Sequence, residues 1–392
     1  MNAPLDGVVV LDLTRALSGP YCTMLLADLG ADVIKVESPA GDSSRRTGPF
    51  PQDDAEHLYG GYFQSVNRNK RSVVVDFRSP EGIAAVRRLA AGADVLIENF
   101  RAGVMDRMGL SYESLQRDNP RLVYGALRGF GDPRTGASPH VDRPAFDVVV
   151  QAMGGLMGIT GPPHLPTKVG PGIGDLFPAS LLAVGVLAAL TDRERTGRGR
   201  FVDVAMYDAI VSLCERVVYQ HSYNQAVPTG DGNDHPLLCP FGLYRTADGW
   251  VTIAAPRDHQ WQALAKTLGR PGLGDDPRFA TNNARVVVRD QVRAVIEDWT
   301  SALPTAEVVD ALSAQVPCGP VNSAADIYAD PHLRIRDMLV ELEQPGSADP
   351  VTVAGQPIKF AGAETRAYRR APLLGEHTAE VLGADAPPTT DR

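Results

Sequence analysis

Val8-Val9-Val10-Leu11-Asp12-Leu13 opens residues 8–37, the part of the sequence that determines the fold. Five of these six residues are apolar, which predicts a buried strand. Residues 20–29 predict a helix, and Gly30 stands where a helix C-cap glycine belongs. Asp32-Val33-Ile34-Lys35-Val36-Glu37 predicts a second strand. Strand, helix and strand at this spacing form a βαβ unit, which implies a parallel sheet.

The same alternation continues along the first half of the chain. We expect further strands at residues 73–77, 94–98 and 121–127, and a helix from Pro80 to about residue 91 that ends at Gly92. Residues 201–204 fit either a strand or the start of a helix. No GxGxxG motif follows the first strand, so a nicotinamide-dinucleotide site is not supported.

The length of 392 residues suits two domains rather than one. Near residue 222 the sequence changes to a loop rich in glycine and proline, followed by short strands at 241–245 and 250–254 and helices near 258–268, 285–301 and 305–315. We therefore predict an α/β protein: a Rossmann-like large domain with a parallel sheet and a smaller α/β domain. The expected parts are residues 1–221 for the first part of the large domain, 222–330 for the small domain and 331–392 for a segment returning to the large domain.

A second notable stretch is Lys168-Val169-Gly170-Pro171-Gly172-Ile173-Gly174-Asp175-Leu176-Phe177-Pro178. The apolar run 179–190 after it predicts a buried helix with Pro178 in its first turn. A carboxylate beside a helix N-terminus is stabilised as the anion and is available as a nucleophile. Asp175 would equally serve as a helix cap, so these residues alone leave both roles open.

Composition excludes several classes of function. The formal net charge is −9, which argues against nucleic-acid and anionic-membrane partners. The run 179–190 is too short to span a bilayer. Four widely spaced cysteines and unpaired histidines predict no metal site and no disulfide framework, which favours a cytoplasmic location.

Polar and cationic residues follow the strand expected at 94–98, beginning with Asn99 and Phe100 and continuing to Arg101 and Arg107. Ligands of open α/β sheets bind at the carboxyl ends of the strands. Taken alone, the two arginines fit a solvated helix face equally well.

The sequence resembles the class III CoA-transferases, the family of formyl-CoA transferase, carnitine CoA-transferases and α-methylacyl-CoA racemase. The matching segments occur in the family's order and spacing: residues 18–37, 69–72, 98–100, 107–109, 174–175, 196–199, 317–320 and 370–377. By this resemblance Asp175 is the nucleophile, which forms an acyl-aspartyl anhydride and then an aspartyl-CoA thioester. Glycines beside it, Gly174 among them, would leave N–H groups free for the developing oxyanion. Asp147 would support Asp175 or be a surface helix residue.

The resemblance also implies that residues 1–221 bind coenzyme A, as substrate and product, with a small carboxylic acid as the other partner and no metal. The CoA-contacting positions that carry over are Ala16, Leu17, Lys70, Arg71, Asn99, Phe100, Arg107 and Met108. Of these, Lys70 and Arg71 would meet the phosphates of the adenosine end. Formyl-CoA transferase has glutamine where this chain has Leu17, and arginine where it has Ser38.

Two alternative functions have to be compared with CoA transfer, and the same resemblance implies one assembly. A racemase on this fold places a histidine directly before an aspartate, but this chain has Phe146-Asp147, and phenylalanine carries no proton. A non-catalytic CoA-binding protein would keep Lys70, Arg71 and Asn99 without needing Asp175. The family's interlocked homodimer is the expected assembly.

Overall fold

The computed structural model describes residues 3–362 and 367–383, so parts of the segment predicted from 331 to 392 lie outside the described residues. The chain divides into two compact units. The first comprises the chain up to Leu156, Lys168–Tyr219 and the residues from Pro331 onward, and the second comprises Met157–Thr167 and Gln220–Asp330. The sequence-based division had kept residues 157–167 with the large domain.

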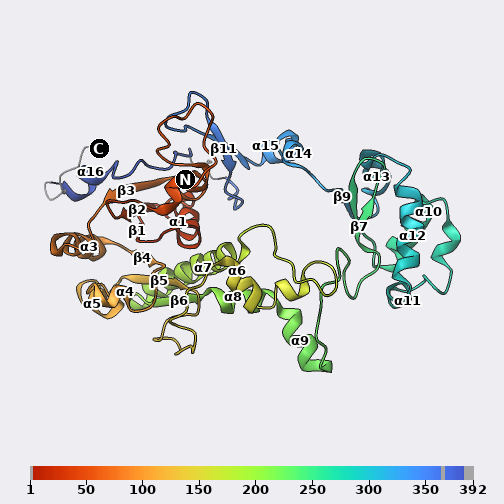
Figure 1. The fold of residues 1–392 in the computed structure, drawn as a ribbon, viewed down its shortest axis with the longest axis horizontal. Helices are drawn as coiled ribbons and strands as arrows, with labels where there is room; N and C mark the ends of the chain where they lie inside the picture. The colour runs from red at the N-terminus through yellow and green to blue at the C-terminus, as the bar shows by residue number, and fades with distance from the viewer. Residues whose placement is uncertain (1–2, 363–366, 384–392) are drawn as a thin grey trace. The chain divides into compact units, whose positions relative to one another are not determined.

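The first unit is built on a six-stranded sheet in the order β3-β2-β1-β4-β5-β6, and every neighbouring pair is parallel (Figure 1). This confirms the predicted α/β fold with a parallel sheet. The strand order reverses between β1 and β4, and ligands of such sheets bind at that point. The strands are β1 (Val9–Asp12), β2 (Asp32–Glu37), β3 (Lys70–Val74), β4 (Val95–Glu98), β5 (Val123–Arg128) and β6 (Phe201–Ala205).

Helices cover both faces of this sheet. On one face α1 (Ser18–Asp28) packs against β1, β2 and β4, and α7 (Ile173–Thr196) packs against β5 and β6. On the other, α3 (Pro80–Gly92) and α5 (Tyr112–Asp118) complete a buried apolar core with the strands. The remaining helices of this unit are α2 (Gly61–Asn67), α4 (Val104–Arg107), α6 (Asp147–Met153), α8 (Met206–Leu213), α15 (Pro331–Ile335), α16 (Thr378–Leu382) and the 3-10 turn η1 (Ser43–Arg46).

Two local predictions in this unit need correction. The strand expected at 73–77 begins at Lys70, because it pairs with β2 from Val33 onward. Helix α3 ends at Gly92 as predicted, but Gly92 is its last helical residue and not a left-handed C-cap, because Ala93 leads in extended conformation into β4. Gly30, in contrast, adopts a φ of +110° after α1, as expected of a glycine at a helix end.

Helix α7 begins earlier than predicted and is longer. It starts at Ile173, so Pro178 lies inside the helix rather than in its first turn, which Asp175 occupies. Because proline has no N–H, the Gly174 carbonyl cannot receive the usual bond from residue 178. Its length and apolar composition would suffice to cross a membrane, but it packs against α1, α8, β5 and β6 as a core helix.

The second unit contains an antiparallel sheet in the order β7-β8-β9, surrounded by helices. β7 (Phe241–Arg245) and β8 (Trp250–Ala254) have the predicted bounds. The single helix expected at 285–301 is divided at Val288, where the backbone leaves the helical conformation. The other elements are α10 (Asp258–Thr267), α11 (Asn282–Val287), α12 (Arg289–Thr300), α13 (Thr305–Leu312), α14 (Ala324–Ala329), β9 (Cys318–Pro320), η2 (Met157–Ile159) and η3 (Pro271–Gly274).

Two further segments join the units along the chain. Helix α9 (Glu215–Asn224) starts in the first unit and continues into the second. After residue 331 the chain returns to the first unit, where β10 (Leu339–Leu342) pairs with β11 (Val351–Ala354) and α16 packs against β3.

Candidate active site

A cavity of about 390 Å³ opens in the first unit beyond the carboxyl ends of β1, β4 and β5. Its walls come from the loops that follow these strands, from residues 141–146 and from the first turn of α7. The side chains most relevant to chemistry are Arg15, Ser18, Asn99, Arg101, Arg143 and Asp175. The cavity therefore lies where the strand order predicts a ligand site.

Asp175 is the carboxylate of this cavity. It is the third residue of α7, and its N–H donates to the Gly172 carbonyl at 3.0 Å. Burial raises the pKa of Asp175 to about 6, the neighbouring carboxylate of Asp147 adds to the rise, and the Ser18 hydroxyl opposes it. Asp175 is therefore ionised at neutral pH but less firmly solvated than a surface carboxylate, which suits a nucleophile.

Asp147, the first residue of α6, fixes the turn that carries Asp175. Its Oδ1 accepts a hydrogen bond from the Gly174 N–H at 2.8 Å and another from Gln151 Nε2 at 2.8 Å, and Lys168 Nζ lies 3.4 Å from its Oδ2. The expectation of a free Gly174 N–H for an oxyanion is therefore wrong in this structure. These contacts place Asp147 beside the turn that carries Asp175, and its supporting role stays a prediction.

Gly174 is required for packing at this point. A Cβ added there would lie 2.7 Å from Val150 Cγ2 and 2.9 Å from the Asp147 carbonyl oxygen, both on α6. These distances are too short for any other residue, so glycine allows α6 and α7 to approach and Asp147 to reach the backbone.

The coupling between the two carboxylates predicts a pH dependence. As the nucleophile that the resemblance implies, Asp175 would attack only as the anion, so kcat/KM is expected to fall about tenfold per pH unit below a pKa of about 6. Asp147→Asn removes one of the two charges but keeps an oxygen for the Gly174 N–H, so the acidic limb should move to lower pH. Asp175 is still buried in this variant, so the acidic limb of the pH profile should still lie at a higher pH than the pKa of an ordinary aspartate.

The measurement is the pH profile of kcat/KM with an acyl-CoA donor. Asp192→Asn, in the last turns of the same helix, where Asp192 pairs with Arg195 and Arg200, is the control and should leave the acidic limb in place. An unchanged limb in Asp147→Asn would contradict the coupling.

The loop after β1 is tied to the loop after β4. The Asn99 side chain accepts from the Arg15 N–H at 2.9 Å and donates to the Arg15 carbonyl at 2.8 Å, and the Arg15 guanidinium lies 5.0 Å from the centre of the Phe100 ring. Leu17 packs beside Gly172, where an added Cβ would lie 3.1 Å from Leu17 Cδ2. The structure thus brings Ala16, Leu17, Asn99 and Phe100 together near Asp175, and their contact with CoA stays a prediction.

A second cavity of about 170 Å³ adjoins the first and shares Arg15 and Phe100 with it. Its walls are mostly apolar and include Phe77, Val104 and Met108, together with Ser38. Met108 thus lies at this cavity. Arg107 lines neither cavity, and its contact with CoA stays a prediction.

Lys70 and Arg71 also line neither of these cavities. The buried Lys70 ammonium donates to Asp12 Oδ2 at 3.0 Å, to the Pro20 carbonyl at 2.9 Å and to Asn67 Oδ1 at 2.9 Å. Burial lowers its pKa to about 8 although Asp12 opposes this. Lys70 is therefore a structural group, contrary to the predicted phosphate contact. Arg71 is partly exposed and pairs with Asp32 and Glu380, so its contact stays a prediction.

Sequence reasoning missed Arg15 and Arg143 and assigned no role to Arg101. Within residues 3–362 and 367–383, none of these three arginines forms an ion pair, although all line the cavity of Asp175. Arg15 was detectable, because it follows β1 at the same sheet edge as Asn99 follows β4. No group of three or more His, Cys, Asp or Glu residues in the described part of the chain could hold a metal ion.

Comparison with known proteins gives a consistent result. The sequence model described as CoA-transferase family III matches residues 5–378. A succinyl-CoA:mesaconate CoA-transferase of Haloarcula marismortui is 50% identical over 379 residues, which cover 96% of this chain and 95% of that protein. A succinate–glutarate CoA-transferase of Agrobacterium fabrum is 38% identical, with 97% and 95% covered. The crystal structure of a CaiB/BaiF family protein from Brucella suis superposes with a TM-score of 0.86 at 38% identity, covering 98% of this chain and all of that one.

Proposed function

Because the chain belongs to CoA-transferase family III, we propose that it exchanges CoA between dicarboxylic acids through covalent intermediates on Asp175. CoA-transferase activity itself follows from similarity along nearly the whole chain and confirms the activity that the sequence predicts. One observation supports the finer assignment: a single raised-pKa carboxylate shares its cavity with three arginines that have no carboxylate partner among the described residues. The two relatives are named for succinate, mesaconate and glutarate, which are all dicarboxylates.

The proposed reaction begins when the Asp175 carboxylate attacks the thioester carbonyl of the donor. The C–S bond breaks, and the products are CoA thiolate and a mixed anhydride of the donor acid with Asp175. The thiolate then attacks the Asp175 carbonyl, which gives an aspartyl-CoA thioester and releases the donor acid. The acceptor carboxylate attacks this thioester, which releases CoA thiolate and leaves a mixed anhydride of the acceptor acid with Asp175. The thiolate then attacks the acceptor carbonyl, which yields the new acyl-CoA and free Asp175.

The two adjoining cavities suggest how acyl-CoA lies. We place the adenine ring in the apolar cavity beside Phe100 and Met108, and the thioester in the larger cavity at Asp175. The chain between the two ends would pass the backbone of Ala16 and Leu17. Arg107 and Arg71 remain candidates for the phosphates. CoA needs no metal in this scheme.

The racemase alternative has little support. The residue at the position of the racemase histidine is Phe146, whose side chain is 72% exposed and cannot exchange a proton. A binding protein without catalysis is set aside because the relatives are enzymes along the same length of chain.

The test of substrate class is a set of acceptors offered to the enzyme with succinyl-CoA, with the product CoA esters identified by mass. We expect succinate, mesaconate and glutarate to exchange well and butyrate, a monocarboxylate as long as succinate, to exchange poorly. Equal kcat/KM for butyrate and the dicarboxylates would contradict the assignment.

Arg15 is the arginine we assign to the free carboxylate of the dicarboxylate. Its backbone is held by Asn99, so Arg15→Gln changes the side chain without releasing the loop. A hydrogen bond to a charged group contributes about 1.5–3 kcal/mol, so kcat/KM for succinate should fall about 10- to 100-fold. The value for butyrate should stay the same. Arg101→Gln and Arg143→Gln are the matched variants. If one of them selectively lowers kcat/KM for succinate and Arg15→Gln does not, the free carboxylate is bound by that arginine instead of Arg15.

The working unit is proposed to be an interlocked homodimer acting in the cytoplasm, without nucleic-acid or membrane partners. Large apolar side chains stay exposed on helices of the first unit, among them Val148, Val184 and Val218, and a second copy would cover them. Four free cysteines agree with a reducing compartment. Interlocked chains cannot separate without unfolding, so tagged and untagged dimers mixed under native conditions should form no mixed species over hours. Rapid exchange, or a monomer at micromolar concentration, would contradict this assembly.

A further inference from the structure

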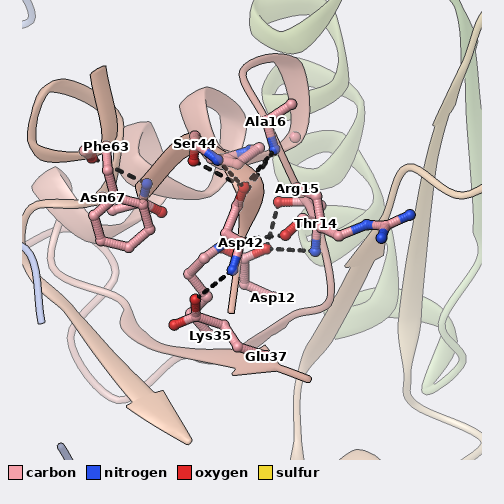
Figure 2. Close-up of polar contacts among 12 residues, drawn as sticks. Asp12, Thr14, Arg15, Ala16, Lys35, Glu37, Asp42, Ser44, Phe63 and Asn67 are labelled. Carbon is pink, nitrogen blue, oxygen red and sulfur yellow. Dashed lines mark hydrogen bonds and ion pairs between the residues drawn. The ribbon is translucent and has the colours of Figure 1, made fainter. Parts of the chain in front are cut away.

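Side chains hold the loop between β1 and α1 at five consecutive main-chain polar groups, and Figure 2 labels three of the residues that supply them, Asp12, Lys35 and Asp42. These groups run from the Thr14 N–H to the Ala16 N–H, and their partners come from β1, β2 and the loops after β2 and β4. The bonds are Thr14 N–H to Asp12 Oδ1 at 2.9 Å, Lys35 Nζ to the Thr14 carbonyl at 2.9 Å, both Arg15 groups with Asn99, and the Ala16 N–H to Asp42 Oδ1 and Oδ2 at 3.2 and 3.3 Å.

Ala16 needs this support because its backbone is unusual. Its φ of +66° lies in the left-handed region, which costs a residue with a Cβ free energy that glycine would not lose. Such conformations persist where the surroundings impose them, and they gather at ligand sites. The group that receives the Ala16 N–H is the carboxylate of Asp42.

Asp42 is itself fixed and ionised. Its side chain is 1% exposed, and Lys35 Nζ lies 3.0 Å from its Oδ2. Its Oδ1 accepts from the Ser44 N–H at 3.0 Å and the Ser44 hydroxyl at 2.8 Å. Burial alone would raise the pKa of Asp42, but Lys35 and Ser44 hold it below the usual value. A buried carboxylate with this many partners has little freedom to move.

Lys35 connects Asp42 to the same loop by a second route. Its fully buried ammonium also donates to the Thr14 carbonyl, which belongs to the peptide before Arg15. The same ammonium pairs with Asp42, whose carboxylate accepts from the N–H of the peptide after Arg15. The loop that carries Arg15 and leads to Ser18 is thus shaped by charges that do not reach the cavity of Asp175.

We propose that Asp42 is a positioning residue for CoA transfer: by holding Ala16 in the left-handed conformation, it keeps residues 14–17 in the shape that receives CoA. The inference rests on the proposed function only for the identity of the cavities as the CoA site. Asp42 lines the second cavity but not the cavity of Asp175, and its carboxylate bonds to Lys35, Ser44 and the Ala16 N–H. Its effect is to raise the fraction of molecules whose loop is ready to bind.

This role predicts a particular kinetic pattern for Asp42→Asn. The amide loses the ion pair with Lys35, so a smaller fraction of the free enzyme has the loop in the conformation that binds CoA. The apparent affinity for CoA falls in proportion to that fraction. We expect CoA to bind about tenfold more weakly by calorimetry and KM for acyl-CoA to rise about as much. Once CoA is bound the loop is in place, so kcat should stay within about threefold.

Asp28→Asn is the matched control. Asp28 is also a buried carboxylate of the first unit, 2.6 Å from Arg68 NH2, but it lies at the far end of α1 and has no contact with the loop. It should lower the melting temperature, as Asp42→Asn does, and leave CoA affinity within about twofold. If Asp28→Asn weakens CoA binding as much as Asp42→Asn, or if Asp42→Asn leaves it unchanged, the proposal is overturned.

A second pair of variants tests the conformation with Asp42 intact, in case Asp42→Asn does not fold. Asparagine tolerates the left-handed region and valine does not, although the two are similar in size. Ala16→Val should therefore weaken CoA binding about tenfold more than Ala16→Asn. Equal effects would contradict the proposal. CoA binding reports on the conformation of the loop and does not depend on which acids are exchanged. The result would therefore still hold if the dicarboxylate assignment failed.

Discussion

Asp175→Asn is expected to lower kcat for CoA exchange by about 10⁴-fold or more, since removal of a covalent nucleophile costs this much or more in enzymes that depend on one. Asparagine nearly matches the carboxylate in shape, and its amide cannot form the anhydride or the thioester. Affinity for CoA should stay within about twofold, because binding groups such as Asn99 are untouched. The measurement is steady-state exchange from succinyl-CoA together with calorimetric binding of CoA.

The control for this variant is Asp147→Asn, which changes the neighbouring carboxylate. Asp147 holds the Gly174 N–H and raises the pKa of Asp175, so its loss should shift the pH profile and keep most of the turnover near neutral pH. Turnover above a tenth of the wild-type value in Asp175→Asn, with the protein folded, would contradict the nucleophile assignment.

Asp12→Ala should destabilise the first unit by about 3–5 kcal/mol, since removing one partner of a buried ion pair leaves the other charge without compensation. The Asp12 side chain is fully buried and accepts from Lys70 Nζ at 3.0 Å and from the Thr23 hydroxyl at 2.7 Å. Its removal leaves Lys70 and Lys35 buried with fewer negative neighbours. A urea titration followed by circular dichroism measures the loss.

The same group sets a pH dependence of stability. Burial alone would raise the pKa of Asp12, but Lys70 and Lys35 with the hydroxyls of Thr14 and Thr23 hold it well below the usual value. A depressed pKa stabilises the fold above the unfolded value of 3.8, and this contribution is lost as the pH falls below it. Asp118→Ala, which removes an exposed pair with Arg87, is the control and should leave the urea midpoint unchanged. A similar loss in both variants would contradict the importance of the buried pair.

The sequence predicted the sheet because its signals are local. The βαβ pattern of residues 8–37 needs only hydrophobic periodicity and the glycine at position 30, and both act within a few residues. The site at the carboxyl edge followed from the position of Asn99 directly after a strand. The family and its CoA-transferase activity were predicted correctly from motifs spread along the chain.

Predictions that depend on distant partners did worse. Lys70 has the charge that a phosphate site needs, but its partner Asp12 lies 58 residues earlier and takes the ammonium into the core. The Gly174 N–H was expected to be free, but Asp147, 27 residues away, accepts it. Sequence gives the type of a polar group but not which of several opposite groups it meets. The proposed role of Asp42 was beyond the sequence for the same reason, since its loop gives no local sign that it meets Ala16.

The central claim, that CoA passes through a covalent bond to Asp175, is tested most directly by peptide mass after a single turnover. The enzyme is incubated with succinyl-CoA without acceptor, treated with hydroxylamine and digested. The account predicts a hydroxamate on the peptide that contains Asp175, and none when the Asp175→Asn protein is treated in the same way. Modification of a different residue, or exchange activity without any modified peptide, would contradict it.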